Sequence, residues 1–237
     1  METRRDIAFD RTITFIQYLL QLPELTWVWD REKQKLNGNL GGQTWSFRMP
    51  LPWPNADKSV GLLQYLDNLP SVPLPYFLII MQAGHSALAY YEDGEMRHHK
   101  VIKKYMVRGN GKAQVGYLQT RGKSKAGSRI RLANTVSFFE DINEKLTEWD
   151  VADEAARILV SCPISLQSLW FESRIQPPFS KDDPRLLKVP VDVHRPDLEE
   201  LERVNRIIQR GRWEGPVAVV DNFFSAQRLE KDEFEED

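Results

Sequence analysis

The residues best suited to chemistry are Gly111-Lys112-Ala113-Gln114, which lie near the centre of a strongly basic stretch. The carboxamide of Gln114 can donate and accept hydrogen bonds at once, so it can orient a water molecule or a hydroxyl group at a reacting centre. A carboxamide is not a general base at any accessible pH. We therefore expect Gln114 to act by positioning a reacting group.

Residues 97–131 contain eleven Lys or Arg residues and no Asp or Glu. The whole chain has a formal charge of -2, so the remaining residues sum to -13. A basic segment on an otherwise acidic chain attracts a polyanion in a preferred orientation. Uniform charge at a pI near 6.1 would argue against a nucleic-acid partner, but this charge is segregated.

The segment from about Gly109 to Ser128 is predicted to be a long flexible loop, because it lacks hydrophobic periodicity and is rich in glycine. Gly109, Gly111 and Gly116 surround Gln114. Glycine tolerates positive φ and lets a backbone approach its ligand closely.

The elements that must hold this loop follow from hydrophobic patterns. Residues 76–82, 87–91 and 101–107 are predicted strands of an antiparallel meander, and residues 134–149 form an amphipathic helix after the loop. The other expected elements are helices over 9–21, 153–157 and 197–209, strands over 27–29, 44–47, 158–160 and 169–171, a turn at 37–39, and an extended segment over 184–193.

This order predicts an α/β (α+β) fold with a mixed central sheet flanked by helices. We expect residues 1–70 to form an N-terminal helix and β-hairpin packed on the main domain, residues 71–215 to form that domain, and residues 216–237 to be an acidic tail.

Several classes of site are disfavoured by composition. Cys162 is the only cysteine, so no disulfide can form within the chain and a multi-cysteine zinc site is excluded. His98 and His99 come just before the predicted strand over 101–107, and adjacent residues of a strand point to opposite faces, so we expect no metal site. The chain has no nucleotide-binding fingerprint, and we expect no cofactor. It also lacks a signal peptide and an apolar run long enough for a membrane span, which predicts a cytoplasmic protein with no membrane partner.

Several short motifs in a fixed order resemble the Vms-like release factor family, a group similar to the catalytic middle domain of eukaryotic and archaeal peptide release factors. The resemblance covers roughly residues 75–210. Its motifs are Lys104-Tyr105-Met106-Val107-Arg108, Gly111-Lys112-Ala113-Gln114, Lys125-Ala126-Gly127-Ser128-Arg129-Ile130-Arg131, Ser168-Leu169-Trp170-Phe171, Asp183-Pro184-Arg185-Leu186, Val189-Pro190, Arg195-Pro196 and Glu199-Glu200-Leu201.

The resemblance implies a release-factor middle-domain-like (RNase H-like) sheet with a mobile basic loop. It also implies a substrate, the peptidyl-tRNA left on a stalled or split large ribosomal subunit, with Gln114 as the catalytic residue and RNA rather than DNA as the polyanion. Either the ester or the tRNA near its 3′ CCA end is cut, and the sequence does not choose. The residues expected to bind RNA are Arg108, Lys112, Arg121, Lys123, Lys125, Ser128, Arg129 and Arg131. Arg129 and Arg131 alternate with Ser128 and Ile130 as they leave the loop, and pairing with acidic residues remains an open alternative for them.

A second motif, Gly41-Gly42-Gln43, spells the tripeptide that release factors use for hydrolysis. It lies in a predicted hairpin over residues 36–47, where Gly-Gly is typical of a turn that needs no function. The release-factor position is filled instead by residues 111–114, with Ala113 in place of the second glycine.

Two other functions stay open. The chain could be a non-catalytic module that binds a ribosomal or tRNA site, or an RNase H-like nuclease. The nuclease is disfavoured because no acidic metal cluster is evident near the loop.

Overall fold

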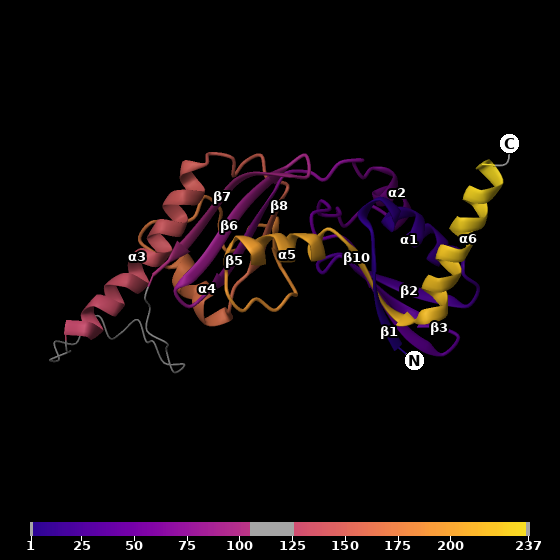
Figure 1. Ribbon diagram of the computed structural model, residues 1–237, viewed down its shortest axis with the longest axis horizontal. Helices are drawn as coiled ribbons and strands as arrows, with labels where there is room; N and C mark the ends of the chain where they lie inside the picture. The colour runs from indigo at the N-terminus through magenta and orange to yellow at the C-terminus, as the bar shows by residue number, and fades with distance from the viewer. Residues whose placement is uncertain (1, 105–125, 236–237) are drawn as a thin grey trace. The chain divides into compact units, whose positions relative to one another are not determined.

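The computed structural model describes residues 2–104 and 126–235, with side chains described over 3–104 and 134–228. These residues form two compact units, Met1–Pro70 with Arg206–Asp237, and Ser71–Asn205 (Figure 1). Each unit has its own five-stranded sheet. The division places residues 206–237 with the N-terminal part of the chain, whereas the sequence led us to expect a main domain through residue 215.

The first unit contains an antiparallel sheet with the strand order β1-β10-β4-β3-β2. Its core combines one face of α1 with bulky aromatic residues of the strands, because Phe15, Ile16 and Leu19 recur at helical spacing and bury fully against Phe47 and Trp213. The elements of this unit are β1 (Glu2–Ile7), a 3-10 turn η1 (Phe9–Arg11), α1 (Thr12–Gln21), β2 (Leu25–Asp30), β3 (Lys35–Leu40), β4 (Gln43–Arg48), α2 (Leu62–Asp67), β10 (Gly211–Pro216) and α6 (Val217–Glu235).

Two expectations for this unit were wrong. The predicted turn at residues 37–39 lies in the middle of β3, where Gly38 meets the neighbouring strand so closely that a Cβ atom would lie 1.8 Å from the carbonyl oxygen of Thr26. The expected acidic tail includes α6, whose apolar residues Val219, Val220 and Phe223 join the core. Because many acidic residues follow residue 228, the short apolar face of α6 was not recognised from the sequence.

The second unit contains a mixed sheet with the strand order β7-β6-β5-β8-β9. Strands β5, β6 and β7 form the predicted antiparallel meander, and β8 and β9 run parallel to β5. The mixed sheet and its helices confirm the predicted α/β class. The elements are β5 (Tyr76–Gln82), β6 (His85–Glu92), β7 (Glu95–Lys103), α3 (Ala126–Glu148), β8 (Arg157–Ser161), α4 (Ile164–Phe171), β9 (Leu186–Lys188) and α5 (Leu198–Ile208).

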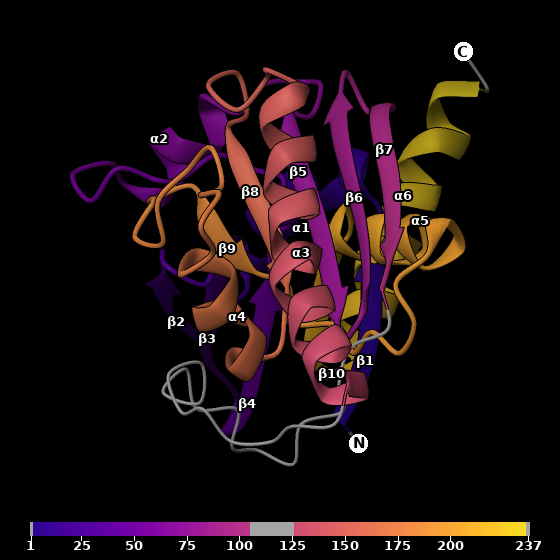
Figure 2. The same cartoon turned by 90° about the vertical axis from the view of Figure 1, so that its left-hand side faces the viewer.

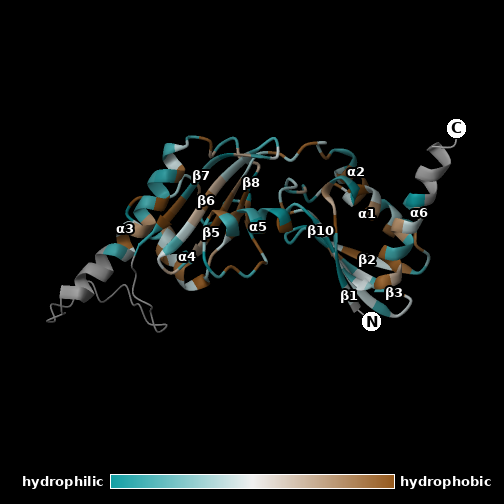
Figure 3. Ribbon diagram, in the orientation of Figure 1, coloured by the Kyte–Doolittle hydropathy of each residue, from teal (hydrophilic) through white to brown (hydrophobic). Residues whose placement is uncertain are grey.

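Helices cover both faces of this sheet. Helices α3 and α4 lie on one face (Figure 2), where Phe77 and Ile158 pack with Phe138 and Trp170. Helix α5 lies on the other face, and the Tyr76 hydroxyl donates to Asn205 Oδ1 at 2.7 Å there. In Figure 3 the strands carry the hydrophobic residues and α5 is largely hydrophilic.

Three expectations for the second unit were wrong. Residues 169–171 belong to helix α4, because an apolar run of three residues does not reveal whether its period is helical or extended. Residues 153–156 form turns before β8 instead of a helix. Strand β7 begins at Glu95, six residues before the predicted start. Within the described residues, no helix combines the length and hydropathy that a bilayer span requires.

Candidate functional site

The basic segment, which here means residues 105–125, joins the end of β7 to the start of α3. These two elements define where it attaches. Residues 105–125 lie outside the described part of the chain. The predicted site residues within them are Gln114, Gly109, Gly111, Gly116, Arg108, Lys112, Arg121, Lys123 and Lys125, and their placement stays a prediction.

Both attachment points lie at one edge of the second unit's sheet. Strands β5, β7 and β8 all run in the same direction, since β6 is antiparallel to both β5 and β7. Their carboxyl ends, Gln82, Lys103 and Ser161, therefore share an edge. Ligands of open α/β sheets commonly bind outside the carboxyl ends of the strands, so this edge is a favourable place for a reactive segment.

Lys104 joins the end of β7 to α3. Its backbone N–H donates to the Gly84 carbonyl at 2.9 Å, and its ammonium group donates to Ser137 Oγ at 2.9 Å and to the Ser137 carbonyl at 3.1 Å. The same ammonium lies 2.7 Å from Asp141 Oδ2. These contacts fix the residue that precedes the predicted catalytic segment. Sequence reasoning missed this role because the partners of the ammonium group lie more than thirty residues away.

Helix α3 begins well before the point where Lys104 contacts it. Eleven residues separate Ala126 from Ser137, which corresponds to about 16 Å along the helix axis. The first turns of α3 project past the end of the sheet (Figure 1). The first turn holds no acidic residue, so the partial positive charge of the helix N-terminus adds to the basic character of this end.

The backbone of Ser128, Arg129 and Arg131 is helical, which corrects the expectation of a loop through Ser128. Ala126, Arg129, Arg131 and the residues that follow favour a helix. The cations are concentrated at the start of α3, and Glu140, Asp141, Glu144 and Glu148 follow further along it. A polyanion is therefore drawn to the end that carries the basic segment.

Four basic residues of the stretch 97–131 have described side chains. Of these four, two are available to contact a partner molecule. Arg97 lies within 3.6 Å of carboxylate oxygens of Glu92, Asp93 and Glu95, and Lys104 is paired as above. Lys100 and Lys103 are exposed on β7 and make no ion pair with any residue of known placement. Part of the predicted basic surface therefore stabilises the protein itself.

The competing motif forms the turn between β3 and β4 in the first unit. Gly41 and Gly42 have φ values of 53° and 83°, which glycine adopts easily, and Gln43 is exposed. This geometry agrees with the hairpin interpretation of the motif.

Two other sequence candidates have ordinary surroundings. The ring of His98 stacks on Trp149 with 5.6 Å between centroids. Burial raises the pKa of the Cys162 thiol to about 12, so the nucleophilic thiolate is absent at neutral pH.

A family model decides how the chain is classified. Residues 76–214 match the Bacteroidetes VLRF1 release factor family. The chain belongs to this family. The match confirms the resemblance predicted from the motifs, and it spans the second unit together with the basic segment.

Curated relatives of this chain carry the name tRNA endonuclease ANKZF1. The mouse protein is 33% identical over 153 residues, which cover 62% of this chain and 20% of the mouse protein. The human protein is 33% identical over 145 residues, which cover 59% of this chain and 20% of the human protein. The matching region thus spans about a fifth of these relatives. A solved structure, the Vms1 mitochondrial localization core, aligns with a TM-score of 0.46 at 14% identity, covering 84% of this chain and 82% of that one.

Proposed function

We propose that this VLRF1 release factor frees nascent chains from peptidyl-tRNA in stalled ribosomal complexes. The observation that carries the proposal is the family match over residues 76–214, which includes Gln114 and its glycines. The name of the ANKZF1 relatives supports tRNA as the substrate, and the attachment of the basic segment at one sheet edge supports a single RNA-binding end.

Gln114 acts in this proposal by holding the attacking oxygen against the atom that it attacks, which is the carbonyl carbon of the ester or a phosphorus of the tRNA backbone. For ester hydrolysis that oxygen is water, which leaves an intact CCA end and a free peptide carboxylate. For cleavage of the tRNA the attacking group is water or a 2′-hydroxyl, and the peptide leaves with the 3′ nucleotides attached. Lys112, Arg108, Lys123, Lys125 and Arg129 neutralise the RNA backbone in either case. We place the chemistry in the unit Ser71–Asn205, with a large ribosomal subunit in the cytoplasm as the partner.

The decisive experiment replaces Gln114 with alanine and measures release from purified large subunits that carry labelled peptidyl-tRNA. Gln119→Ala is a matched control, because it removes the same side chain from the same segment. We expect Gln114→Ala to lower the rate by about 100-fold or more while ribosome binding persists, since a positioning group contributes mainly to the reaction step. Mass analysis of the tRNA 3′ end then identifies which bond is cut.

Equal rates for wild type and Gln114→Ala would remove Gln114 from the mechanism. Binding of the wild type without any release would support the alternative, a module that occupies the ribosomal or tRNA site without catalysis.

A further inference from the structure

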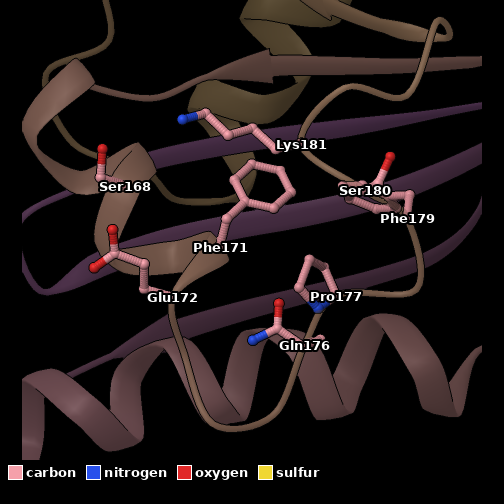
Figure 4. Close-up of a pocket in the computed structure, with 8 residues that line it drawn as sticks. All are labelled: Ser168, Phe171, Glu172, Gln176, Pro177, Phe179, Ser180 and Lys181. Atoms are coloured by element: carbon pink, nitrogen blue, oxygen red, sulfur yellow. The ribbon is translucent and has the colours of Figure 1, made fainter.

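A pocket of about 580 Å³ lies in the second unit where α4 ends (Figure 4). Its walls are the last turn of α4 and the segment that follows, and its volume falls in the range of roughly 300 to 1,000 Å³ typical of small-molecule sites. The residues that line it and carry the argument are Ser168, Phe171, Glu172, Pro177 and Lys181. Ser168 and Phe171 belong to a motif of the family resemblance, and none of these residues was expected to bind a ligand.

The walls of the pocket are held by a buried amide. Asn143 on α3 is fully buried; its Oδ1 accepts from Trp170 Nε1 at 2.6 Å, and its Nδ2 donates to the Ile175 carbonyl at 2.6 Å. These bonds fix the residue just before Phe171 and the residue just before Gln176, where the opposite wall begins. The pocket is therefore largely formed before any ligand arrives, which lowers the entropy cost of binding.

The lining combines an aromatic ring with two separate charges. Figure 4 shows the Phe171 ring between Lys181 and Pro177, with Glu172 and Ser168 along one side. The ring contacts Trp170 and Phe179 at centroid distances of 4.7 and 6.3 Å, so neighbouring aromatic rings hold it in place. Glu172 and Lys181 are exposed, and in the described part of the chain neither is in an ion pair.

We propose that this pocket binds one unstacked nucleotide whose base carries an exocyclic amino group. The Phe171 ring offers an apolar surface for a base, as aromatic side chains do in single-strand binding proteins. The Lys181 ammonium neutralises the phosphate. The Glu172 carboxylate only accepts hydrogen bonds, so it takes the amino group of cytosine or adenine and repels the O4 carbonyl of uracil.

The assignment of this nucleotide to the unpaired end of a tRNA rests on the proposed function, whereas nucleotide binding does not. The pocket lies in the same unit as the ends of the basic segment. A tRNA end that is held both in the pocket and by the basic segment is positioned along its length as well as attracted by charge.

The test uses the full chain labelled with ¹⁵N and titrated with CMP, AMP and UMP. We expect CMP and AMP to shift the amide signals of residues 168–181 saturably, and UMP to bind about fivefold or more weakly. Glu172→Gln should remove most of the difference between CMP and UMP, because a carboxamide also donates. Lys181→Ala should weaken the binding of CMP. It should not change the binding of cytidine, which is weaker because cytidine lacks the phosphate.

Lys188→Ala is the matched control, because Lys188 is exposed on β9 and does not line the pocket. All three substitutions are at exposed positions, so the fold is expected to persist, and melting curves check this. Any of three results would overturn the proposal. The amide signals could show no saturable shift at millimolar nucleotide, CMP and UMP could bind equally, or a peptide carboxylate could cause the shifts instead.

The result of the nucleotide titrations can be distinguished from the result of the release assay with Gln114→Ala. Gln114→Ala should keep wild-type nucleotide affinity even if it abolishes release. Loss of nucleotide preference in Glu172→Gln says nothing about which group positions the attacking oxygen.

Discussion

The Lys104 ammonium lies 2.7 Å from Asp141 Oδ2, joining the end of β7 to α3 at the base of the basic segment. The side chains are 25% and 42% exposed, so solvent screens the pair and its own contribution to stability is modest. Its position matters more, because Lys104 is the last described residue before the segment that carries Gln114. The pair holds Lys104 against α3, and Lys104 is the residue to which that segment is attached.

Lys104→Ala should therefore reduce release more than it reduces stability. We expect the free energy of unfolding to fall by about 1 kcal/mol and release to fall by about tenfold or more, because a misplaced positioning group loses rate steeply. Lys188→Ala is the control, since Lys188 is exposed on β9 and leaves the contacts of Lys104 with α3 intact. In a double-mutant cycle with Asp141→Asn, effects on release that simply add would contradict coupling through this pair.

The start of α3 gives a second prediction, on RNA binding. Arg129→Gln and Arg131→Gln should each lower the slope of log affinity against log salt by about 0.7 to 0.9 if the arginine contacts a phosphate. Fluorescence anisotropy with a tRNA acceptor-stem hairpin measures the slope, with Lys188→Gln as the control on a distant strand. Unchanged slopes would indicate the alternative left open by the sequence, that these arginines pair with acidic residues.

The sequence predicted best the elements whose own residues determine them. Strand β5 was predicted with its exact ends, because its apolar run lies between a proline and a glycine turn. Helix α5 was predicted within one residue, because its apolar stripe follows Asp197, whose carboxylate accepts from the Glu200 N–H at 3.0 Å. Local chemistry sets both elements.

Elements that depend on distant partners were missed. Strand β10 exists because β1 and β4 pair with it on either side, and its two glycines and proline give no strand signal. Helix α4 was mistaken for a strand because its run Leu169-Trp170-Phe171 is apolar and too short to show a helical period. The pocket beside it depends on Asn143, which lies 27 residues before Trp170. The basic segment was found from composition alone, since its charge needs no tertiary context.

The Asp183–Arg185 pair gives a pH-dependent prediction. The hydrogen bonds from Arg185 hold the pKa of the Asp183 carboxyl below its usual value, and the same guanidinium donates to the carbonyls of Ala152 and Ala155. A lowered folded-state pKa means that the stabilisation is present above the unfolded value, about 3.9, and is lost as the pH falls through the folded value.

Asp183→Asn should accordingly destabilise the chain by about 1 to 3 kcal/mol at pH 7, because it leaves a partly buried guanidinium without its carboxylate. The difference from wild type should shrink as the pH is lowered below about 4. Urea unfolding at several pH values measures it, with Asp182→Asn as the control at an exposed neighbour. A difference independent of pH would mean that the carboxylate charge contributes little.

The two glutamine motifs can be separated in one assay. Gln43 is exposed at the start of β4, outside the family match that begins at residue 76, whereas Gln114 lies within that match. Gln43→Ala should leave release within about twofold of wild type, since the turn needs the glycines and not the carboxamide. Gly42→Ala should lower stability by about 1 kcal/mol through its positive φ without a matching loss of release rate per folded molecule. Loss of release in Gln43→Ala, with melting temperature unchanged, would transfer the catalytic role to the hairpin.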